Sequence, residues 1–246
     1  MNANFPENSQ DCRQGNWKTE YFDELSSTSD YVKGKRQEGN NLIAVAKRQS
    51  GGRGTKGRSF SSEVGGVYLS ALTFYKNFPA KRAFEIMASA AVAVCETLRF
   101  YGVTPVIKWA NDVHVNGKKI CGILIENVFS GANVSSSVVG IGVNVTNALP
   151  TELLDIATTL TQETGKEICI EEVTARLIEQ LKTPHSMEEY LSYVGYMGER
   201  ATLLIGEKRV RVRLIKVDKE GGLIVENEDG TQTRYVAAEV SLRLDD

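Results

Sequence analysis

Apolar runs of strand length recur along the first 145 residues, and polar or glycine-rich segments separate them. Short runs rich in β-branched residues predict strands that are buried on at least one side. Such runs lie at residues 17–25, 41–47, 66–75, 103–108, 113–115, 120–128 and 137–145. The dipeptide Asn116-Gly117 separates two of them and predicts a tight β-hairpin.

Helical patterns are fewer. Residues 81–100 combine small and apolar side chains, which predicts a helix that packs closely on a sheet. The apolar stretch 83–100 carries Glu85, Glu96 and Arg99, so it indicates a buried helix and not a membrane span. Residues 171–181 have an amphipathic pattern, and a further short helix is expected at 187–196.

The two ends of the chain differ from its middle. Residues 1–16 are polar and lack periodicity, which predicts a mobile arm. Short alternating runs at 201–205, 209–217, 222–226 and 231–235 predict a small all-β barrel. Within 209–214 arginine alternates with Val or Leu. This alternation indicates either the solvent-exposed face of an edge strand or a patch that contacts an acidic partner.

Composition removes several classes of function. The 246 residues are 41% apolar, enough for a substantial core, and the net charge is -2. That balance argues against nucleic acid or an anionic membrane as a partner, so recognition of an anion must be local. The cysteines (Cys12, Cys95, Cys121 and Cys169) are far apart and the chain has two histidines, which indicates a reduced, cytosolic compartment. The N-terminus lacks a signal-peptide pattern.

Residues 49–60 read Q-S-G-G-R-G-T-K-G-R-S-F and lie between two predicted strands. They match neither the Walker pattern nor the dinucleotide-binding pattern. Glycines allow backbone amides to approach a phosphate, and Arg53 and Arg58 add donors suited to carboxylate and phosphate. The alternative is an exposed, flexible basic hairpin.

A second cation-rich stretch, residues 108–126, follows downstream. Lys118 and Lys119 come directly after the predicted hairpin turn, where most lysines are simply solvated. Trp109 has the ordinary interpretation of a core residue. His114 lies on a strand without a visible partner, so we expect no catalytic role for it.

Two further polar features allow two interpretations each. The corner at 26–30, S-S-T-S-D, favours capping of a helix at 31–37, and its hydroxyl groups could also face a polar ligand. Gly140 and Gly142 indicate that something approaches the backbone closely. Asn144 is either a buried, satisfied amide or a side chain that reads a base.

Several motifs occur in one order: G-R-G-T-K-G-R-S-F at 52–60, K-W-A-N-D at 108–112, N-G-K-K-I-C-G-I-L-I-E at 116–126, G-I-G-V-N-V at 140–145 and E-V-S-L-R at 239–243. Each motif alone is weak, but the set resembles biotin protein ligases from about Tyr21 to Arg243. The resemblance implies an α+β fold with a mixed β-sheet catalytic domain flanked by helices (class II synthetase-like) at 17–197. A small C-terminal SH3-like β-barrel would follow at 198–246.

The resemblance also implies the reaction. Biotin would attack the α-phosphate of ATP, in the presence of Mg²⁺, to give biotinyl-5′-AMP, and a lysine of a biotin carboxyl carrier protein domain of a biotin-dependent carboxylase would then accept the biotin. Repressor-type ligases have an N-terminal DNA-binding domain, and nothing long enough for it precedes Trp17. We therefore expect the form without it: a cytoplasmic monomer or weak homodimer that binds neither nucleic acid nor membrane.

The functional residues of the family map onto matching positions. Lys119, Lys108 and Arg53 are implied as catalytic, with Lys119 bridging the biotin carboxylate and the α-phosphate. The implied biotin-binding residues are Ser27, Thr28, Ser29, Gln49, Arg53, Gly54, Thr55 and Lys119. The implied ATP-binding residues are Lys56, Arg58, Phe60, Asn111, Asn144 and Arg243, and Phe60 stands where a tryptophan commonly stacks on adenine. Asp112 is a candidate base or magnesium-side residue.

Three positions depart from the family's pattern. Thr55 stands where many ligases have an arginine that helps retain the adenylate, so we expect a leakier intermediate unless Lys56 compensates. Ala110 replaces the usual proline of K-W-P-N-D. Ser29 replaces an asparagine and so removes one amide from the biotin pocket.

Other functions remain open on the sequence alone. A lipoate-type ligase would use the same adenylation chemistry, although K-W-A-N-D and the barrel segments favour biotin. A small-molecule binding module without turnover would bind anions and be indifferent to Lys119. We see no Ser–His or Cys–His arrangement for a protein nucleophile.

Overall fold

A mixed seven-stranded sheet forms the larger part of the protein. The structure is a computed structural model that describes residues 16–244, so the arm expected at 1–16 lies, except for Asn16, outside the described residues. The strand order is β1-β2-β3-β7-β6-β5-β4. The strands are β1 (Trp17–Leu25), β2 (Asn41–Gln49), β3 (Val67–Pro79), β4 (Val106–Lys108), β5 (Asp112–Val115), β6 (Lys118–Ser130) and β7 (Asn133–Val143). β1 and β2 are parallel, and the other neighbouring pairs are antiparallel.

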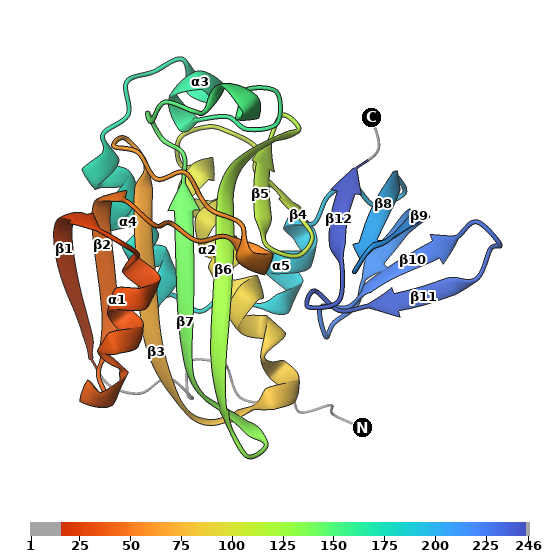
Figure 1. Ribbon diagram of the computed structural model, residues 1–246, viewed down its shortest axis with the longest axis horizontal. Coiled ribbons are helices and arrows are strands. Elements are labelled where there is room, and N and C mark those ends of the chain that lie inside the picture. Colours follow the sequence, from red (N-terminus) through yellow and green to blue (C-terminus); the bar gives the residue numbers. More distant parts are fainter. Residues whose placement is uncertain (1–15, 245–246) are drawn as a thin grey trace.

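Helices cover the two faces of this sheet differently (Figure 1). The helices are α1 (Thr28–Gly34), α2 (Phe84–Arg99), α3 (Leu160–Thr164), α4 (Ile170–Lys182) and α5 (Met187–Tyr193). Behind the sheet, α2 and α4 pack on a core that contains alternate strand residues such as Ile43, Leu69 and Ile141. In front, α1 packs through Val32 on a smaller cluster with Leu72. The part of the front face that α1 does not cover is therefore available for a ligand-binding site.

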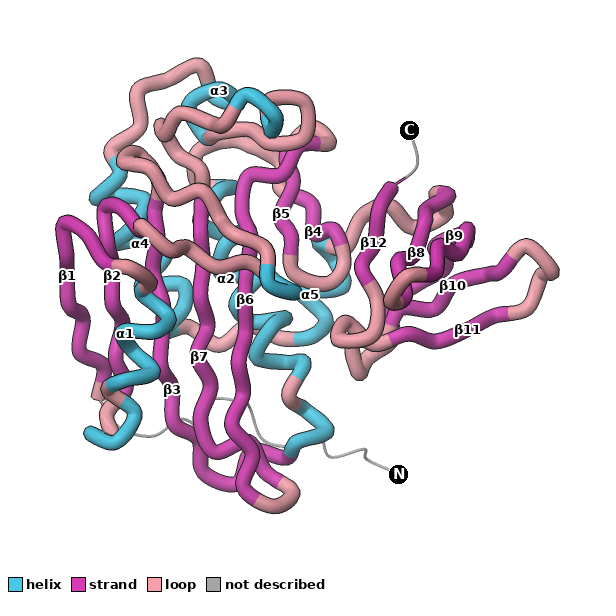
Figure 2. The backbone as a smooth tube through the Cα atoms, viewed as in Figure 1, coloured by secondary structure: helices cyan, strands magenta, loops and turns pink. Residues whose placement is uncertain are grey.

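A five-stranded antiparallel sheet follows, in the order β11-β10-β9-β8-β12. Its strands are β8 (Arg200–Ile205), β9 (Lys208–Val217), β10 (Leu223–Asn227), β11 (Gln232–Tyr235) and β12 (Ser241–Leu244). Figure 2 shows this smaller unit beside β4, with β12 nearest to the large sheet. Nε1 of Trp109 donates a hydrogen bond of 3.0 Å to the carbonyl oxygen of Gly221, and this bond joins the two units. The expected α+β class, with an SH3-like C-terminal sheet, is confirmed.

The local predictions hold best where the hydrophobic period is clear. The hairpin at Asn116-Gly117 is confirmed: β5 and β6 pair around it, and both residues have positive φ, at 50° and 80°. The first helix begins at Thr28 and not at Tyr31, because Ser27 is its N-cap and accepts from the Asp30 amide at 3.3 Å. The short elements α3 and β12 were not predicted. Among the described residues, none of the helices combines the length and the apolar character that a membrane span requires.

Candidate active site

A patch of bare backbone lies on the front of the sheet, where two glycines face each other across β6 and β7. A Cβ atom on Gly142 would lie 2.5 Å from the ring of Phe60, and one on Gly122 would lie 3.1 Å from Nζ of Lys119. Any side chain at either position would therefore displace the ring or the ammonium group. Figure 1 shows the segment between β2 and β3, which carries Phe60, crossing the sheet in front. The predicted close approach to this backbone is confirmed at Gly142.

Three buried hydroxyl groups meet beside the patch. Oγ of Ser70 lies 2.8 Å from Oγ1 of Thr28 and 2.9 Å from Oγ of Ser29. A Cβ atom on Gly140 would lie 2.7 Å from Oγ of Ser29, so glycine makes the room for this cluster. Each hydroxyl both donates and accepts, so the cluster can turn part of its hydrogen bonding toward a ligand. Sequence reasoning missed Ser70, and the available signal was one polar residue within the otherwise apolar start of β3.

The side chain of Gln49 ties the hydroxyl cluster to the glycine-rich segment. Its Oε1 accepts from the backbone N of Thr28 at 2.8 Å and from Oγ1 of the same residue at 3.0 Å. Its Nε2 donates to Oγ of Ser62 at 3.0 Å. The capping interpretation of the 26–30 corner is confirmed for Ser27, whereas Thr28 and Ser29 lie in the first turn of α1 and are buried. Gln49 thus joins α1 to Ser62, which lies just after the glycine-rich segment.

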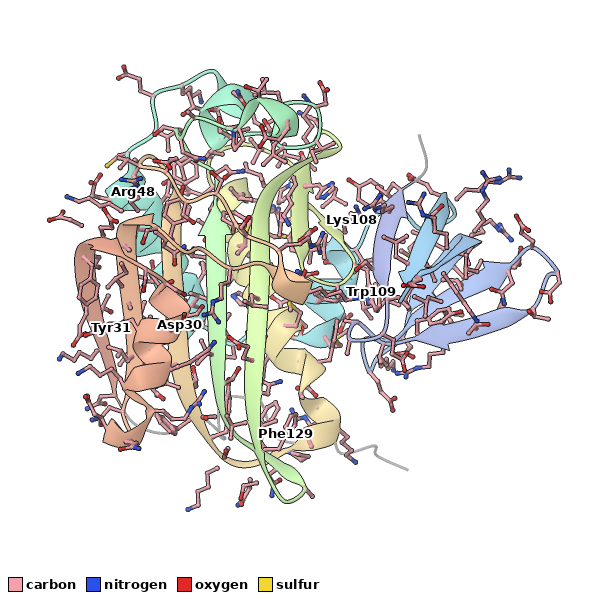
Figure 3. The ribbon with its side chains drawn as sticks, viewed as in Figure 1. Asp30, Tyr31, Arg48, Lys108, Trp109 and Phe129 are labelled. Carbon is pink, nitrogen blue, oxygen red and sulfur yellow. The ribbon has the colours of Figure 1, made fainter. Side chains whose placement is uncertain are left out.

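The tip of the glycine-rich segment folds back on itself. Arg53 and Ser59 form an antiparallel bridge, and the amide of Gly54 donates to the carbonyl oxygen of Arg58 at 2.7 Å. Nη2 of Arg53 lies 2.8 Å from Oδ2 of Asp30 on α1. This ion pair was not predicted. It holds the first arginine of the segment beside the hydroxyl cluster, and Figure 3 shows Asp30 on the front of the sheet.

Arg58, the second arginine of the segment, is held by Thr55. Nη2 of Arg58 donates to Oγ1 of Thr55 at 2.8 Å, and Nε donates to the carbonyl oxygen of Thr55 at 3.2 Å. Lys56, between Thr55 and Arg58 in the sequence, has a positive φ of 56° and an exposed side chain. The segment therefore presents one arginine toward α1, while Thr55 orients the other.

Two lysines and an aspartate converge from three adjacent strands. Lys108 on β4 is directly opposite Asp112 on β5, and Asp112 is opposite Gly122 on β6. The register between β5 and β6 shifts between Val113 and His114, and this bulge brings Lys119 to the face that carries Asp112. Nζ of Lys119 lies 2.7 Å from Oδ1 of Asp112.

The bulge also gives Lys118 and Lys119 different surroundings, which the sequence alone did not distinguish. Nζ of Lys118 turns away and donates to the carbonyl oxygen of Leu154 at 2.8 Å. Both lysines are half-buried, but the Lys119 ammonium lies beside Gly122, whereas the Lys118 ammonium is bonded to the exposed residue Leu154. Only one of the neighbouring lysines is thus placed to act at the glycine patch.

The cations influence one another. Partial burial lowers the pKa of Lys108, Asp112 opposes the shift, and the nearby charges of Lys119, Arg58 and Arg243 lower it further. Like charges that lower a lysine pKa indicate a region arranged for an anion. Figure 3 shows Lys108 at the boundary between β4 and β12, and Arg243 belongs to β12. Arg243 is thus close enough for its charge to reach the site.

His114 has a partner that the sequence did not reveal. Its Nδ1 lies 3.1 Å from Oη of Tyr196, which follows α5. Burial, together with the charges of Lys108 and Lys119, lowers the pKa of His114 to about 4, although Asp112 opposes the shift. The imidazole is therefore neutral at pH 7 and joins the site strand to the connection with the barrel.

The two asparagines make protein contacts. Nδ2 of Asn111 donates to the carbonyl oxygen of Ile123 at 2.8 Å. Asn144 is buried, and its Oδ1 accepts from Nδ2 of Asn147 at 3.3 Å, which agrees with a satisfied amide. Trp109 is buried, as expected of a core residue. Within residues 16–244, no group of three or more His, Cys, Asp or Glu side chains could hold a metal ion.

The sequence of this chain is similar to those of known proteins. The profile of the Biotin/lipoate A/B protein ligase family matches residues 21–144. The bifunctional ligase/repressor BirA of Bacillus subtilis is 32% identical over 238 residues, which cover 88% of this chain and 72% of the relative. A biotin--[acetyl-CoA-carboxylase] ligase of Paracoccus denitrificans is 30% identical over 213 residues, covering 80% of this chain and 88% of the relative.

Solved structures agree with the sequence relatives. The biotin protein ligase of Aquifex aeolicus in complex with biotin and ATP superposes with a TM-score of 0.73 at 30% identity. The superposition covers 92% of this chain and 99% of that one. Similarity therefore extends through both sheets, beyond the segment that the family profile matches.

Proposed function

This chain belongs to the biotin/lipoate A/B protein ligase family and is a biotin protein ligase, and we propose from that premise that it makes biotinyl-5′-AMP and transfers biotin to a lysine of a carrier domain. In the first step a carboxylate oxygen of biotin attacks the α-phosphorus of ATP. The bond to the β-phosphate breaks and pyrophosphate leaves. In the second step the lysine amine attacks the activated carbonyl, AMP leaves and a proton is released.

The hydroxyl cluster is the proposed site for the polar ring of biotin. Ser27, Thr28 and Ser29 would offer hydroxyl groups, with Gln49 holding Thr28 in place. Ser70 joins this proposal because its Oγ touches both Thr28 and Ser29. A cyclic urea has two N–H donors and one carbonyl acceptor, and hydroxyl groups can satisfy both kinds.

The cations are proposed to act on the charge of the first step. Biotin carboxylate and ATP repel each other, and negative charge grows on phosphate oxygens as pyrophosphate leaves, so fixed cations lower the barrier by positioning and electrostatics. Lys119 would bridge the carboxylate and the α-phosphate, and Lys108 would stabilise the phosphates. Arg53, Gly54 and Thr55 would lie along the carboxylate and phosphate.

The nucleotide is proposed to lie between the glycine-rich segment and the barrel. Phe60 would stack on adenine after moving from the Gly142 backbone, which it now touches. The remaining proposed contacts with ATP are Lys56, Arg58, Asn111, Asn144 and Arg243. Asn144 already bonds to Asn147, so it would contribute through one of its other polar groups.

Mg²⁺ is the metal that usually accompanies ATP, and proteins usually hold it through one or two carboxylates besides the phosphates. Asp112 lies beside Lys119 and Lys108 and would offer one such carboxylate. When bound, the metal would neutralise charge on phosphate oxygens. The same carboxylate is the candidate base for the incoming lysine, whose ordinary pKa of about 10.4 requires loss of a proton.

One observation carries the proposal: Lys119 lies over the Gly122 backbone and is paired with Asp112, while its neighbour Lys118 points away. We expect Lys119→Ala to reduce biotin-dependent pyrophosphate release by at least about a hundredfold, the scale of a lost transition-state contact. Lys118→Ala removes the same charge outside the site and should stay within about twofold, since surface charges act weakly. Equal activity of the two variants would overturn the assignment of Lys119.

A further inference from the structure

One exposed face of the C-terminal sheet is cationic. Along β9 the side chains of Val212 and Leu214 are buried, while Arg209, Arg211 and Arg213 alternate with them and are exposed. Successive residues of a strand point to opposite faces, so the three arginines share the outer face. This alternation is the sequence feature that the proposed ligase chemistry leaves unexplained.

The arginines of this sheet differ in their partners. Arg213 donates three hydrogen bonds to Glu226, at 3.0, 3.1 and 3.3 Å, and Arg234 lies 2.6 Å from Asp218. Across residues 16–244, by contrast, neither Arg209 nor Arg211 has an acidic oxygen within 4.0 Å. With Thr202 and Glu228 they line an open hollow of about 420 Å³. A surface arginine without an ion pair keeps its full charge available to a partner.

Strand pairing connects the hollow to Arg243, one of the residues proposed to bind ATP. Arg243 on β12 is directly opposite Thr202 on β8, and Thr202 is directly opposite Arg211 on β9. Neighbouring strands are about 4.8 Å apart, so the backbones of Arg243 and Arg211 are separated by about 10 Å. Arg243 in turn is near enough to Lys108 for its charge to lower the lysine pKa. One row of residues thus leads from the site across the barrel.

We propose that Arg209 and Arg211 form a docking surface for an acidic region of the protein that accepts biotin, next to its target lysine; this rests on the proposed function. A folded domain of about 100 residues has a radius of gyration of about 13 Å, so it must cover surface around the site when its lysine enters. The barrel face beside Arg243 lies within that reach and carries unpaired positive charge. Complementary charge raises the rate of encounter and fixes orientation.

The test replaces the two arginines and measures the two steps separately. The double variant Arg209→Glu/Arg211→Glu is compared with Lys216→Glu/Lys219→Glu, which makes the same change in charge elsewhere on the barrel. The probe is a purified biotin carrier domain with acidic residues beside its target lysine. We expect the arginine variant to raise the KM for the carrier by about tenfold at low salt, with kcat unchanged. The lysine variant should differ from the unmodified protein by less than about twofold.

Further readouts keep the outcomes distinct. Pyrophosphate release without carrier, and consumption of the adenylate by hydroxylamine, should be unchanged in both variants, which shows that the fold and the first step are intact. Absence of pyrophosphate release in the unmodified protein would instead refute the proposed function. Reversing the acidic residues of the carrier to lysine should restore a low KM with the arginine variant. A KM for the carrier equal in both charge variants would overturn the proposal. So would binding of duplex DNA that depends on Arg209 and Arg211 while carrier kinetics stay unchanged.

Discussion

Lys119 and Asp112 form an ion pair across neighbouring strands, with 2.7 Å between Nζ and Oδ1. Without the bulge between Val113 and His114, strand alternation would put Lys119 on the other face of the sheet. The pair joins the proposed catalytic cation to the proposed base. Before Asp112 can accept a proton or a metal ion, the arriving anions must draw Lys119 away from it.

Asp112→Asn separates the two roles of that carboxylate. If Asp112 is the base, transfer of biotin from preformed adenylate to the carrier should fall by about a hundred- to ten-thousandfold, the usual size of general base catalysis. If it acts beside the metal, pyrophosphate release should fall instead and its dependence on Mg²⁺ should shift. Transfer from preformed adenylate at the rate of the unmodified protein would rule out the base.

The lowered pKa of Lys108 predicts an effect of pH on the first step. Lysine binds phosphate only while protonated, so its contribution is complete at low pH and is lost as pH rises through the lowered value. Lys108→Arg keeps the charge at all accessible pH values, since arginine does not deprotonate. The alkaline decline of kcat for pyrophosphate release should therefore move to higher pH. An unchanged decline would mean that another group causes it, and Lys118→Arg provides the matched control.

The threonine at position 55 should affect how well the enzyme retains the adenylate intermediate. It now accepts a hydrogen bond from Arg58 where the related ligases commonly have an arginine. Restoring a cation with Thr55→Arg should reduce biotinylation of a bystander protein by several-fold, because an extra fixed charge holds the adenylate phosphate. Thr55→Gln has similar length without the charge and serves as control. No difference between these variants would show that Lys56 already supplies the missing cation.

His114 predicts how stability depends on pH. Its pKa is about 4 in the folded protein and about 6.5 in the unfolded chain, so the unfolded chain takes up the proton first. Stability from this group is complete above pH 6.5 and is lost as pH falls toward 4, by up to about 3 kcal/mol. His114→Phe should flatten the free energy of unfolding in urea over that range. The same fall in the variant and the unmodified protein would contradict a buried neutral imidazole.

The sequence predicted the elements whose hydrophobic period is strong and left the contacts between distant residues open. The strands of the large sheet and the Asn116-Gly117 turn follow from local patterns. The start of α1 was misplaced because four possible caps follow one another at residues 26–29, and local propensity does not choose among them.

The site was only partly accessible to the same reasoning. Motifs pointed to Lys119 and Arg53, but the Arg53–Asp30 ion pair joins residues from α1 and the glycine-rich segment. Ser70 contacts residues more than forty positions away, and the partner of His114 is 82 positions away. Such contacts depend on the register of the sheet and its bulge, which no local pattern specifies.

The central claim is tested most directly by measuring which carboxylic acid substrate supports release of pyrophosphate from ATP. Unmodified protein is supplied with ATP and Mg²⁺, together with biotin, lipoate or no acid, and pyrophosphate is measured without a carrier. We predict release with biotin alone, which would establish adenylation before any transfer. Release with lipoate instead would contradict the assignment of substrate within this family. Absence of release with either acid at saturating ATP would contradict the adenylation chemistry itself.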